Sequence, residues 1–156
     1  MTQNILKDST IHLLHRAGQC ASDIFAEEIS IDNLTPRQFA VLYAISKNEG
    51  LNQTHLVQQT GVDRSTLADI IQRMLKKGLI KRSRTEKDAR AYAVYLTEDG
   101  KTALEQAGPA VSIAEKRLLE VLPEDKRIEF IESLSKIIDI AENNGASQKS
   151  QSLSAD

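Results

Sequence analysis

Residues 61–96 most narrowly constrain the fold of this chain, because a short amphipathic segment is followed there by the pattern of a basic hairpin. Asp63 is placed to cap a helix that begins at Arg64, and Gly78 is placed to end it. The inward positions of that helix are apolar at helical spacing: Leu67, Ile70, Ile71, Met74 and Leu75. The following KRSRTEKDARAYAVYL predicts two short strands, near 79–84 and 91–96. A helix followed by a charged hairpin is a shape that can bind duplex DNA.

The distribution of charge supports a nucleic-acid partner, although the net charge of −2 does not. Residues 61–96 hold nine Lys/Arg and four Asp/Glu, a net of +5. The rest of the chain holds eleven basic and eighteen acidic residues, a net of −7. Phosphate binding depends on the local potential, so the basic segment matters more than the average.

Length and composition predict one domain, with or without an appendage, in a protein of the cytoplasm. The chain has 156 residues, 40% of them hydrophobic, and one cysteine, so an intrachain disulfide framework is excluded. The sequence has no apolar run of membrane-spanning length and no signal-peptide pattern at its start, so we expect no membrane partner.

Helices are also expected on both sides of this segment. Residues 8–29 have helical spacing, and residues 53–60 form a short helix that ends at Gly61. Thr35, Pro36 and Gln38 predict a capping box at the start of another helix. Pro123 opens the last helix, Asn144–Gly145 ends it, and the tail 146–156 is expected to be disordered because it is rich in Ser, Gln and Lys.

The expected DNA contacts follow from helix geometry and side-chain chemistry. The first turn of a groove-binding helix comes closest to the base edges, and here it offers Arg64, Ser65 and Thr66. The outward face continues with Asp69, Gln72 and Arg73. The preceding short helix places Gln53 and Thr54, with His55, where backbone phosphates are expected.

The hairpin adds cations to this predicted interface. Its basic residues include Arg84 and Arg90, and a guanidinium at the tip can enter a narrow minor groove. Asp88 is unfavourable beside phosphate, so we expect it to hold an arginine in place. The alternative for the whole hairpin is a solvated charged face.

These stretches resemble the MarR family of bacterial winged-helix regulators over about residues 30–120. The resemblance lies in LTPRQFAVLYAI, LVQQTGVDRSTLADIIQRMLKKGLI and RSRTEKDARAYAVYLTEDG, most specifically in the triplet Asp88-Ala89-Arg90. It implies a mainly α fold: a winged helix-turn-helix with a small β-hairpin wing and N- and C-terminal dimerisation helices. The implied segments are 1–34 and 98–145 for dimerisation, and 35–97 for DNA binding. Carried over by position, Arg64, Ser65, Thr66 and Arg73 would contact the major groove, and Asp88 and Arg90 would serve the wing.

The resemblance also implies a homodimer that represses transcription at a pseudo-palindromic site and releases DNA when a small molecule binds. The sequence supports a dimer independently of the resemblance. The terminal helices and the apolar positions of 104–121 offer more apolar surface than one winged helix can cover. We expect the effector to be a phenolic or aromatic acid, or its CoA thioester. The residues expected to bind it are His15, Arg16, Gln19, Phe39 and Tyr43.

Each candidate has a plainer alternative. His15, Arg16 and Gln19 can be an exposed polar face, and Phe39 and Tyr43 can be core residues. Cys20 would make a redox sensor, but its apolar neighbours predict a buried, inert thiol. The three histidines form no metal motif, and no cofactor motif or enzyme signature is present. A winged helix used only for protein contact is the other alternative to DNA binding.

Overall fold

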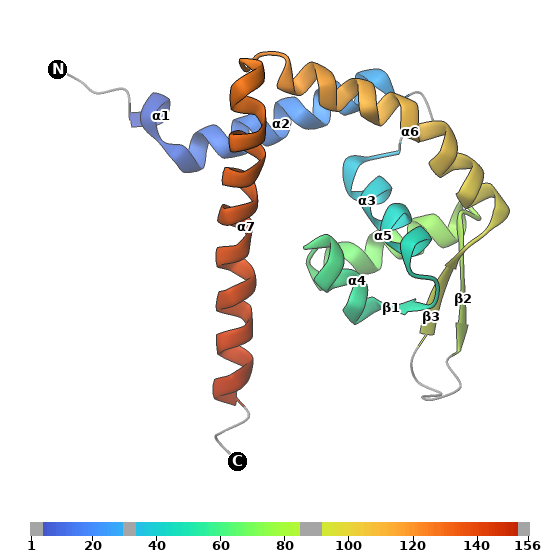
Figure 1. Ribbon diagram of the computed structural model, residues 1–156. Helices are drawn as coiled ribbons and strands as arrows, with labels where there is room; N and C mark the ends of the chain where they lie inside the picture. The colour runs from blue at the N-terminus through green and yellow to red at the C-terminus, as the bar shows by residue number, and fades with distance from the viewer. Residues whose placement is uncertain (1–4, 30–33, 85–91, 153–156) are drawn as a thin grey trace. The chain divides into compact units, whose positions relative to one another are not determined.

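The computed structural model describes residues 5–29, 34–84 and 92–152 and is mainly helical with one small sheet (Figure 1). The chain divides into two compact units, Met1–Lys116 and Arg117–Asp156, and each is described by itself. In chain order the elements are α1 (Ile5–Asp8), α2 (Thr10–Glu28), α3 (Pro36–Lys47), β1 (Leu51–Asn52), α4 (Gln53–Thr60), α5 (Arg64–Lys76), β2 (Ile80–Arg84), β3 (Tyr92–Leu96), α6 (Glu98–Leu119) and α7 (Glu124–Ser152). The predicted fold class, a mainly α winged helix-turn-helix with a hairpin, is confirmed.

The helix starts follow the local sequence as predicted. The Thr35 hydroxyl accepts from the Gln38 backbone N–H at 3.2 Å, and the Gln38 side chain accepts from the Thr35 N–H, so the capping box forms. α4 ends at Gly61, whose φ of 65° is the left-handed conformation that glycine adopts without strain. That turn lets α5 begin three residues later, which gives the helix-turn-helix its short connection.

The sheet contains a strand that the sequence did not predict. Its strand order is β1-β3-β2, and both pairings are antiparallel. β2 and β3 form the predicted hairpin, with Ile80 opposite Leu96 and Arg84 opposite Tyr92. β1 adds Leu51 opposite Val94. A two-residue strand is too short for any alternation to reveal it, and its existence depends on β3 lying beside it.

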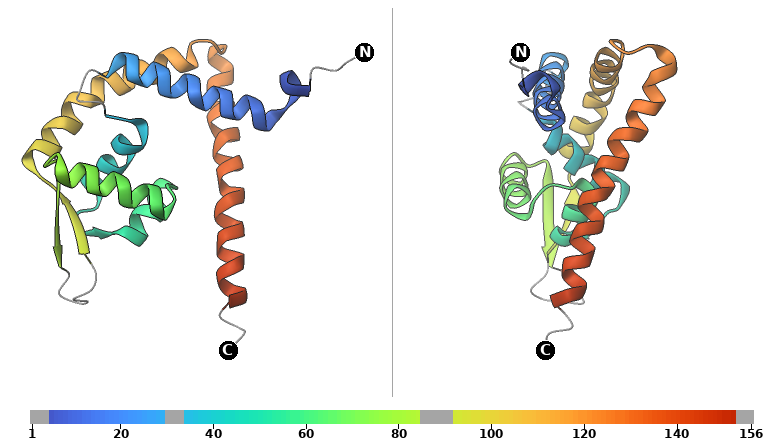
Figure 2. Two further views of the ribbon diagram at one scale, coloured as in Figure 1. Left: turned by 180° about the vertical axis from the view of Figure 1, so that it is seen from behind. Right: turned by 90° about the vertical axis from the view of Figure 1, so that its left-hand side faces the viewer.

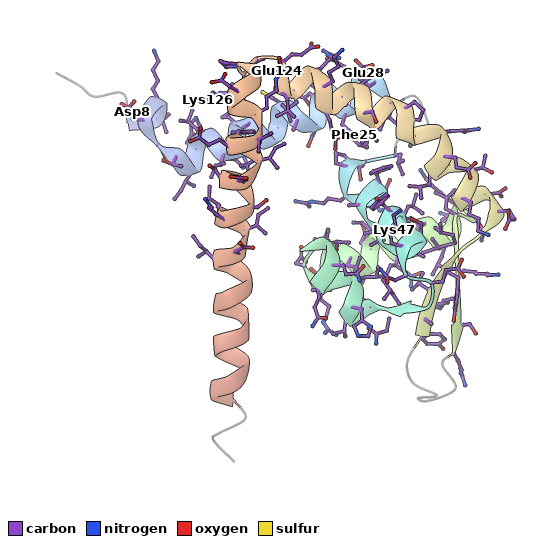
Figure 3. All side chains as sticks on the ribbon, in the orientation of Figure 1. Asp8, Phe25, Glu28, Lys47, Glu124 and Lys126 are labelled. Carbon is purple, nitrogen blue, oxygen red and sulfur yellow. The ribbon has the colours of Figure 1, made fainter. Side chains whose placement is uncertain are left out.

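The core lies where α3, α4 and α5 meet the sheet. Leu42, Ile45, Leu56, Leu67 and Met74 are the largest fully buried side chains among the described residues. Phe25 carries the end of α2 into the same cluster. Its ring meets that of Phe39 edge-on with centroids 6.1 Å apart. Figure 3 labels Phe25 near the end of α2. The helix expected at the N-terminus is therefore fixed to the winged helix by its last turns.

A close backbone contact joins the start of α6 to the end of α5. The Thr97 hydroxyl donates to the Gly78 carbonyl at 2.6 Å and accepts from the Gly100 N–H at 3.0 Å. The Thr97 N–H also donates to the Leu79 carbonyl at 3.1 Å. Gly100 lies so close that an added Cβ would be 1.9 Å from the Leu79 carbonyl oxygen. This contact fixes the base of the hairpin relative to α5 and α6.

The terminal helices differ from prediction in two places. The predicted helix 8–29 is interrupted at Ser9, whose hydroxyl caps α2 by accepting from the His12 N–H at 3.3 Å. α7 runs to Ser152, so the predicted helix end at Asn144–Gly145 is wrong. No proline follows Asn144, and a glycine inside a helix costs only about 1 kcal/mol relative to alanine, which neighbouring helix-forming residues offset. Within the described part of the chain, no helix is both long and apolar enough to cross a membrane.

Candidate nucleic-acid interface

The N-termini of α4 and α5 are brought together by the turn at Gly61. The two helices contact one another and lie next to each other in the left view of Figure 2. The Gln53 side chain, in the first turn of α4, donates a long 3.5 Å hydrogen bond to the Arg64 carbonyl. Thr54 and His55 are exposed next to it. Two helix N-termini on one surface present unpaired N–H groups to an anion, so the pair can bind phosphate oxygens.

Asp63 organises the start of α5. Its Oδ1 accepts from the Thr66 N–H at 2.9 Å and from the Ser65 hydroxyl at 2.8 Å. Hydrogen bonding from the Thr66 side chain is the largest cause that holds the pKa of Asp63 well below its ordinary value, followed by the bonds from the Thr66 N–H and the Ser65 hydroxyl. Ser65 is therefore already engaged, and only its oxygen lone pairs remain to accept from a base.

The exposed face of α5 carries the residues that the sequence proposed for base contacts. Arg64, Ser65, Asp69 and Arg73 are exposed, while Thr66 is half-buried. On the opposite face Leu67, Ile70, Ile71 and Met74 are buried. Arg73 and Asp69 form an ion pair, Nε to Oδ2, of 2.8 Å. The chain thus buries one side of α5 and presents the other to a partner.

The hairpin extends the basic surface beyond α5. In β2 only Ile80 is buried, and Lys81, Arg82, Ser83 and Arg84 are exposed. The Arg82 guanidinium lies over the Tyr92 ring, 4.9 Å from its centroid, and so is held on the sheet. Arg84 is the cation nearest the tip among the described residues. Asp88 and Arg90, the proposed wing pair, lie outside the described residues.

The candidate effector residues line two clefts rather than one. His15, Arg16 and Gln19 line a cleft along α2, named here the α2 cleft, together with Cys20 and Arg37. Its volume is about 850 Å³.

The second cleft, named here the α3 cleft, lies between α3, α4 and α6. It is lined by Phe39 and Tyr43 with Lys47, Val111 and Glu115 and has a volume of about 900 Å³. The rings of Phe39 and Tyr43 stack with centroids 6.1 Å apart, and the Lys47 ammonium lies 5.1 Å from the Tyr43 centroid. The structure therefore separates the aromatic candidates from the cationic ones.

The prediction that Cys20 is buried is wrong. The thiol is exposed, because Phe25 is the only residue of α2 that is buried. The sequence pattern suggested an apolar neighbourhood, but the Cys20 face of α2 does not pack on the core. Cys20 instead borders the α2 cleft beside Arg16 and Arg37. The polar residues His15, Arg16 and Gln19 are exposed, as expected for an outward face.

Two residues of these clefts were not singled out from the sequence. Arg37 follows Pro36 in the first turn of α3 and is exposed, and it lines the α2 cleft. Lys47, at the other end of α3, closes over Tyr43. The spacing of Tyr43 and Lys47, one helical turn apart, was visible in the sequence. The position of Arg37 beside Arg16 depends on how α2 meets α3. No group of three or more His, Cys, Asp or Glu suited to a metal ion occurs among the residues that the structure describes.

The fold and its basic exposed surface are those of a winged-helix protein, and comparison with known proteins gives its family. A model of the MarR family matches residues 32–91. The HTH-type transcriptional repressor NicR of Pseudomonas putida is 31% identical over 134 residues, covering 86% of this chain and 85% of that protein. The chain belongs to the MarR family and is a transcriptional regulator of that type.

Solved structures agree with this assignment. The PcaV transcriptional regulator from Streptomyces coelicolor, in complex with its natural ligand, superposes with a TM-score of 0.84 at 27% identity, over 90% of this chain and 99% of that one. The transcriptional repressor CouR bound to a 23-mer DNA duplex gives 0.79 at 29% identity, over 88% and 98%. CouR bound to p-coumaroyl-CoA also gives 0.79, at 27% identity over 88% and 97%. These relatives are regulators and not enzymes, and the same holds for this chain.

Proposed function

We propose that this regulator is a homodimeric repressor that binds a pseudo-palindromic DNA site through α5 and the hairpin, and that a small aromatic acid or its CoA thioester releases it. The proposed DNA binding rests on the two faces of α5. One face is locked in the core, and the other presents Arg64, Ser65 and Arg73 beside the N-terminus of α4. CouR, a relative of the same fold, has been captured on a DNA duplex. A cytoplasmic location goes with this role, because the partner is genomic DNA.

In this proposal the surface contacts divide into two groups. Arg64, Ser65, Thr66, Asp69 and Arg73 face the major groove, where Arg can bond guanine and Ser or Thr can bond several bases. Gln53, Thr54 and Arg84 contact phosphates, which fixes the register without selecting sequence. Asp88 and Arg90 would act at the wing, in the segment that the structure does not describe. Gln53 already bonds the Arg64 carbonyl, so its contribution includes holding the two N-termini together.

The homodimer is supported by exposed apolar residues on the terminal helices. In α7 the exposed isoleucines are Ile128, Ile131, Ile137, Ile138 and Ile140. In α2 Ile11 and Leu13 are 83% and 50% exposed. A two-fold partner that covered these faces would place two α5 helices about one DNA turn, or roughly 34 Å, apart. Light scattering on the full chain tests this, and a monomer at micromolar concentration would contradict it.

We place the effector in the α2 cleft, because His15, Arg16 and Arg37 offer hydrogen-bond donors to one carboxylate there. Gln19 would bond a ring hydroxyl. Phe39 and Tyr43 remain the alternative, in the α3 cleft with Lys47. The relatives support an aromatic anion as the ligand class: CouR has been captured with p-coumaroyl-CoA.

Thermal-shift screening of phenolic acids and their CoA thioesters tests the effector and its place together. A ligand in the α2 cleft should raise the Tm of the wild type and of Lys47→Ala, but not that of Arg16→Ala. Stabilisation lost in Lys47→Ala and kept in Arg16→Ala would move the site to the α3 cleft. No stabilisation by any compound would contradict the proposed ligand class.

The repressor role is tested by gel shift on the promoter region beside the protein's own gene. Binding should prefer that duplex over an unrelated one, weaken as salt rises, and be reversed by the compound that raised the Tm. Equal, salt-sensitive binding to every duplex would reduce the protein to a non-specific DNA binder. No binding at modest salt would leave protein contact as the use of its winged helix.

A redox function through Cys20 is the second candidate, favoured by one observation. The thiol is exposed at the rim of the α2 cleft, so an oxidant can reach it. If Cys20 is the sensor, peroxide should release DNA from the wild type and not from Cys20→Ser, and a thiol reductant should restore binding. Identical responses of the two proteins would exclude it.

A further inference from the structure

We propose that Asp69 is a positioning residue for Arg73. It holds the guanidinium of Arg73 through Nε, so that the two terminal nitrogens are directed at a guanine in the bound site. This inference rests on the proposed function, because it requires α5 to lie in a DNA groove. It gives a role to the only carboxylate within α5.

The geometry is specific to one edge of the guanidinium. Arg73 Nε and Asp69 Oδ2 are 2.8 Å apart, and the residues are one helical turn apart on α5. The contact uses Nε and leaves the two Nη nitrogens for other acceptors. Guanine presents two acceptors, O6 and N7, at the spacing of an arginine fork. An arginine held in this way therefore presents the end that recognises guanine.

The position of Asp69 makes a purely electrostatic role unfavourable. It is the only acidic residue between Arg64 and Lys76 and is 61% exposed on the outward face. In a groove that face lies between two rows of phosphates, which repel a carboxylate. Asp69 therefore lowers the attraction of α5 for any duplex, and the carboxylate is useful only through what it holds.

The gain lies in the order that Asp69 gives to Arg73. An exposed arginine samples many rotamers, and fixing one of them on binding costs free energy. The Arg73 side chain is 66% exposed, so little besides Asp69 restrains its guanidinium. A restrained guanidinium loses less conformational entropy when it binds a matching guanine, and it must leave its preferred rotamer to reach a phosphate instead. Asp69 is thus expected to raise base preference while lowering overall affinity.

Selection from a duplex library with a randomised centre tests this with the full chain. The wild type defines the preferred sequence, and Asp69→Asn, Arg73→Ala and the double variant are then measured on that duplex and its single-base changes. Arg73→Ala should lose the preference for one G·C pair in each half-site. Asp69→Asn should reduce the same preference about three- to tenfold and bind a random duplex more tightly than the wild type. In the Arg73→Ala background, Asp69→Asn should leave every base preference unchanged.

The controls separate this role from charge and from stability. Glu129→Gln removes a comparable exposed ion pair, with Lys126 at 3.1 Å in α7, and should leave the base preferences as they are. If Asp69→Asn binds all duplexes more tightly by the same factor, the inference is overturned, and Asp69 acts only as a negative charge that repels phosphate. Arg73→Ala with unaltered base preferences would overturn it as well. If the wild type enriches no sequence, the proposed function fails and takes this inference with it.

Discussion

Gly100→Ala is expected to unfold the protein at a markedly lower temperature. The added Cβ would lie 1.9 Å from the Leu79 carbonyl oxygen, 3.0 Å from its carbon and 3.4 Å from Leu96 Cδ2. The nearest atoms are backbone, so α6 must move away from the start of β2. That movement stretches the hydrogen bond from the Thr97 N–H to the same Leu79 oxygen, now 3.1 Å.

The expected size of the effect combines three contributions. Overpacking against atoms that cannot rotate away costs about 1–3 kcal/mol. Weakening the Thr97–Leu79 hydrogen bond costs about 1 kcal/mol more. Alanine returns about 1 kcal/mol through its better helix propensity. The net loss is about 1–3 kcal/mol, which lowers the Tm of a chain of this length by roughly 2–12 °C.

Circular dichroism melts of three variants provide the assay. Gly18→Ala in α2 and Gly108→Ala in α6 are matched controls, because an added Cβ at either position meets no atom within 4 Å. They should keep or raise the Tm. If Gly100→Ala melts with these controls, the close contact between α6 and the residue before β2 does not exist in solution and does not fix the hairpin.

Three further predictions concern the winged helix. Asp63→Ala should lower the Tm because it removes the helix cap, whereas Asp63→Asn keeps the cap and removes the titrating group. Because the pKa of Asp63 is lowered in the folded state, its stabilisation is complete above about pH 4 and is lost as pH falls further. The Tm of the wild type should therefore lose its advantage over that of Asp63→Asn in melts at acid pH. Leu56→Ala should cost about 2–5 kcal/mol in urea unfolding, since Leu56 is fully buried; a cost under 1 kcal/mol would contradict its place in the core. Arg64→Ala should relax base preference, whereas Arg84→Ala should weaken binding to all duplexes and flatten the salt dependence by about one charge; equal effects of both on every duplex would refute the division.

The local parts of the interface were predictable from the sequence. The cap at Asp63, the turn at Gly61 and the buried face of α5 follow from residue type and helical spacing, which do not depend on the rest of the chain. The ion pair between Asp69 and Arg73 was also visible as an i, i+4 spacing.

The predictions that were wrong concern features that depend on packing between elements. β1 forms only because β3 lies beside it, and two residues carry no periodic signal. Cys20 lies among residues of helical spacing, but only the last turns of α2 reach the core, so the thiol is exposed. His15 and Tyr43 were expected in one pocket, yet they line different clefts on α2 and α3. Sequence spacing places residues on a helix face and does not say which face meets which neighbour.

The most direct test of the central claim is the affinity of the full chain for its enriched duplex and for a scrambled duplex of equal composition, over a series of salt concentrations. A regulator that uses α5 in the groove should prefer the enriched duplex by about a thousandfold or more near physiological salt. Both affinities should fall linearly with salt on logarithmic axes. Equal affinity for the two duplexes at every salt concentration would contradict the claim that the exposed face of α5 selects DNA sequence.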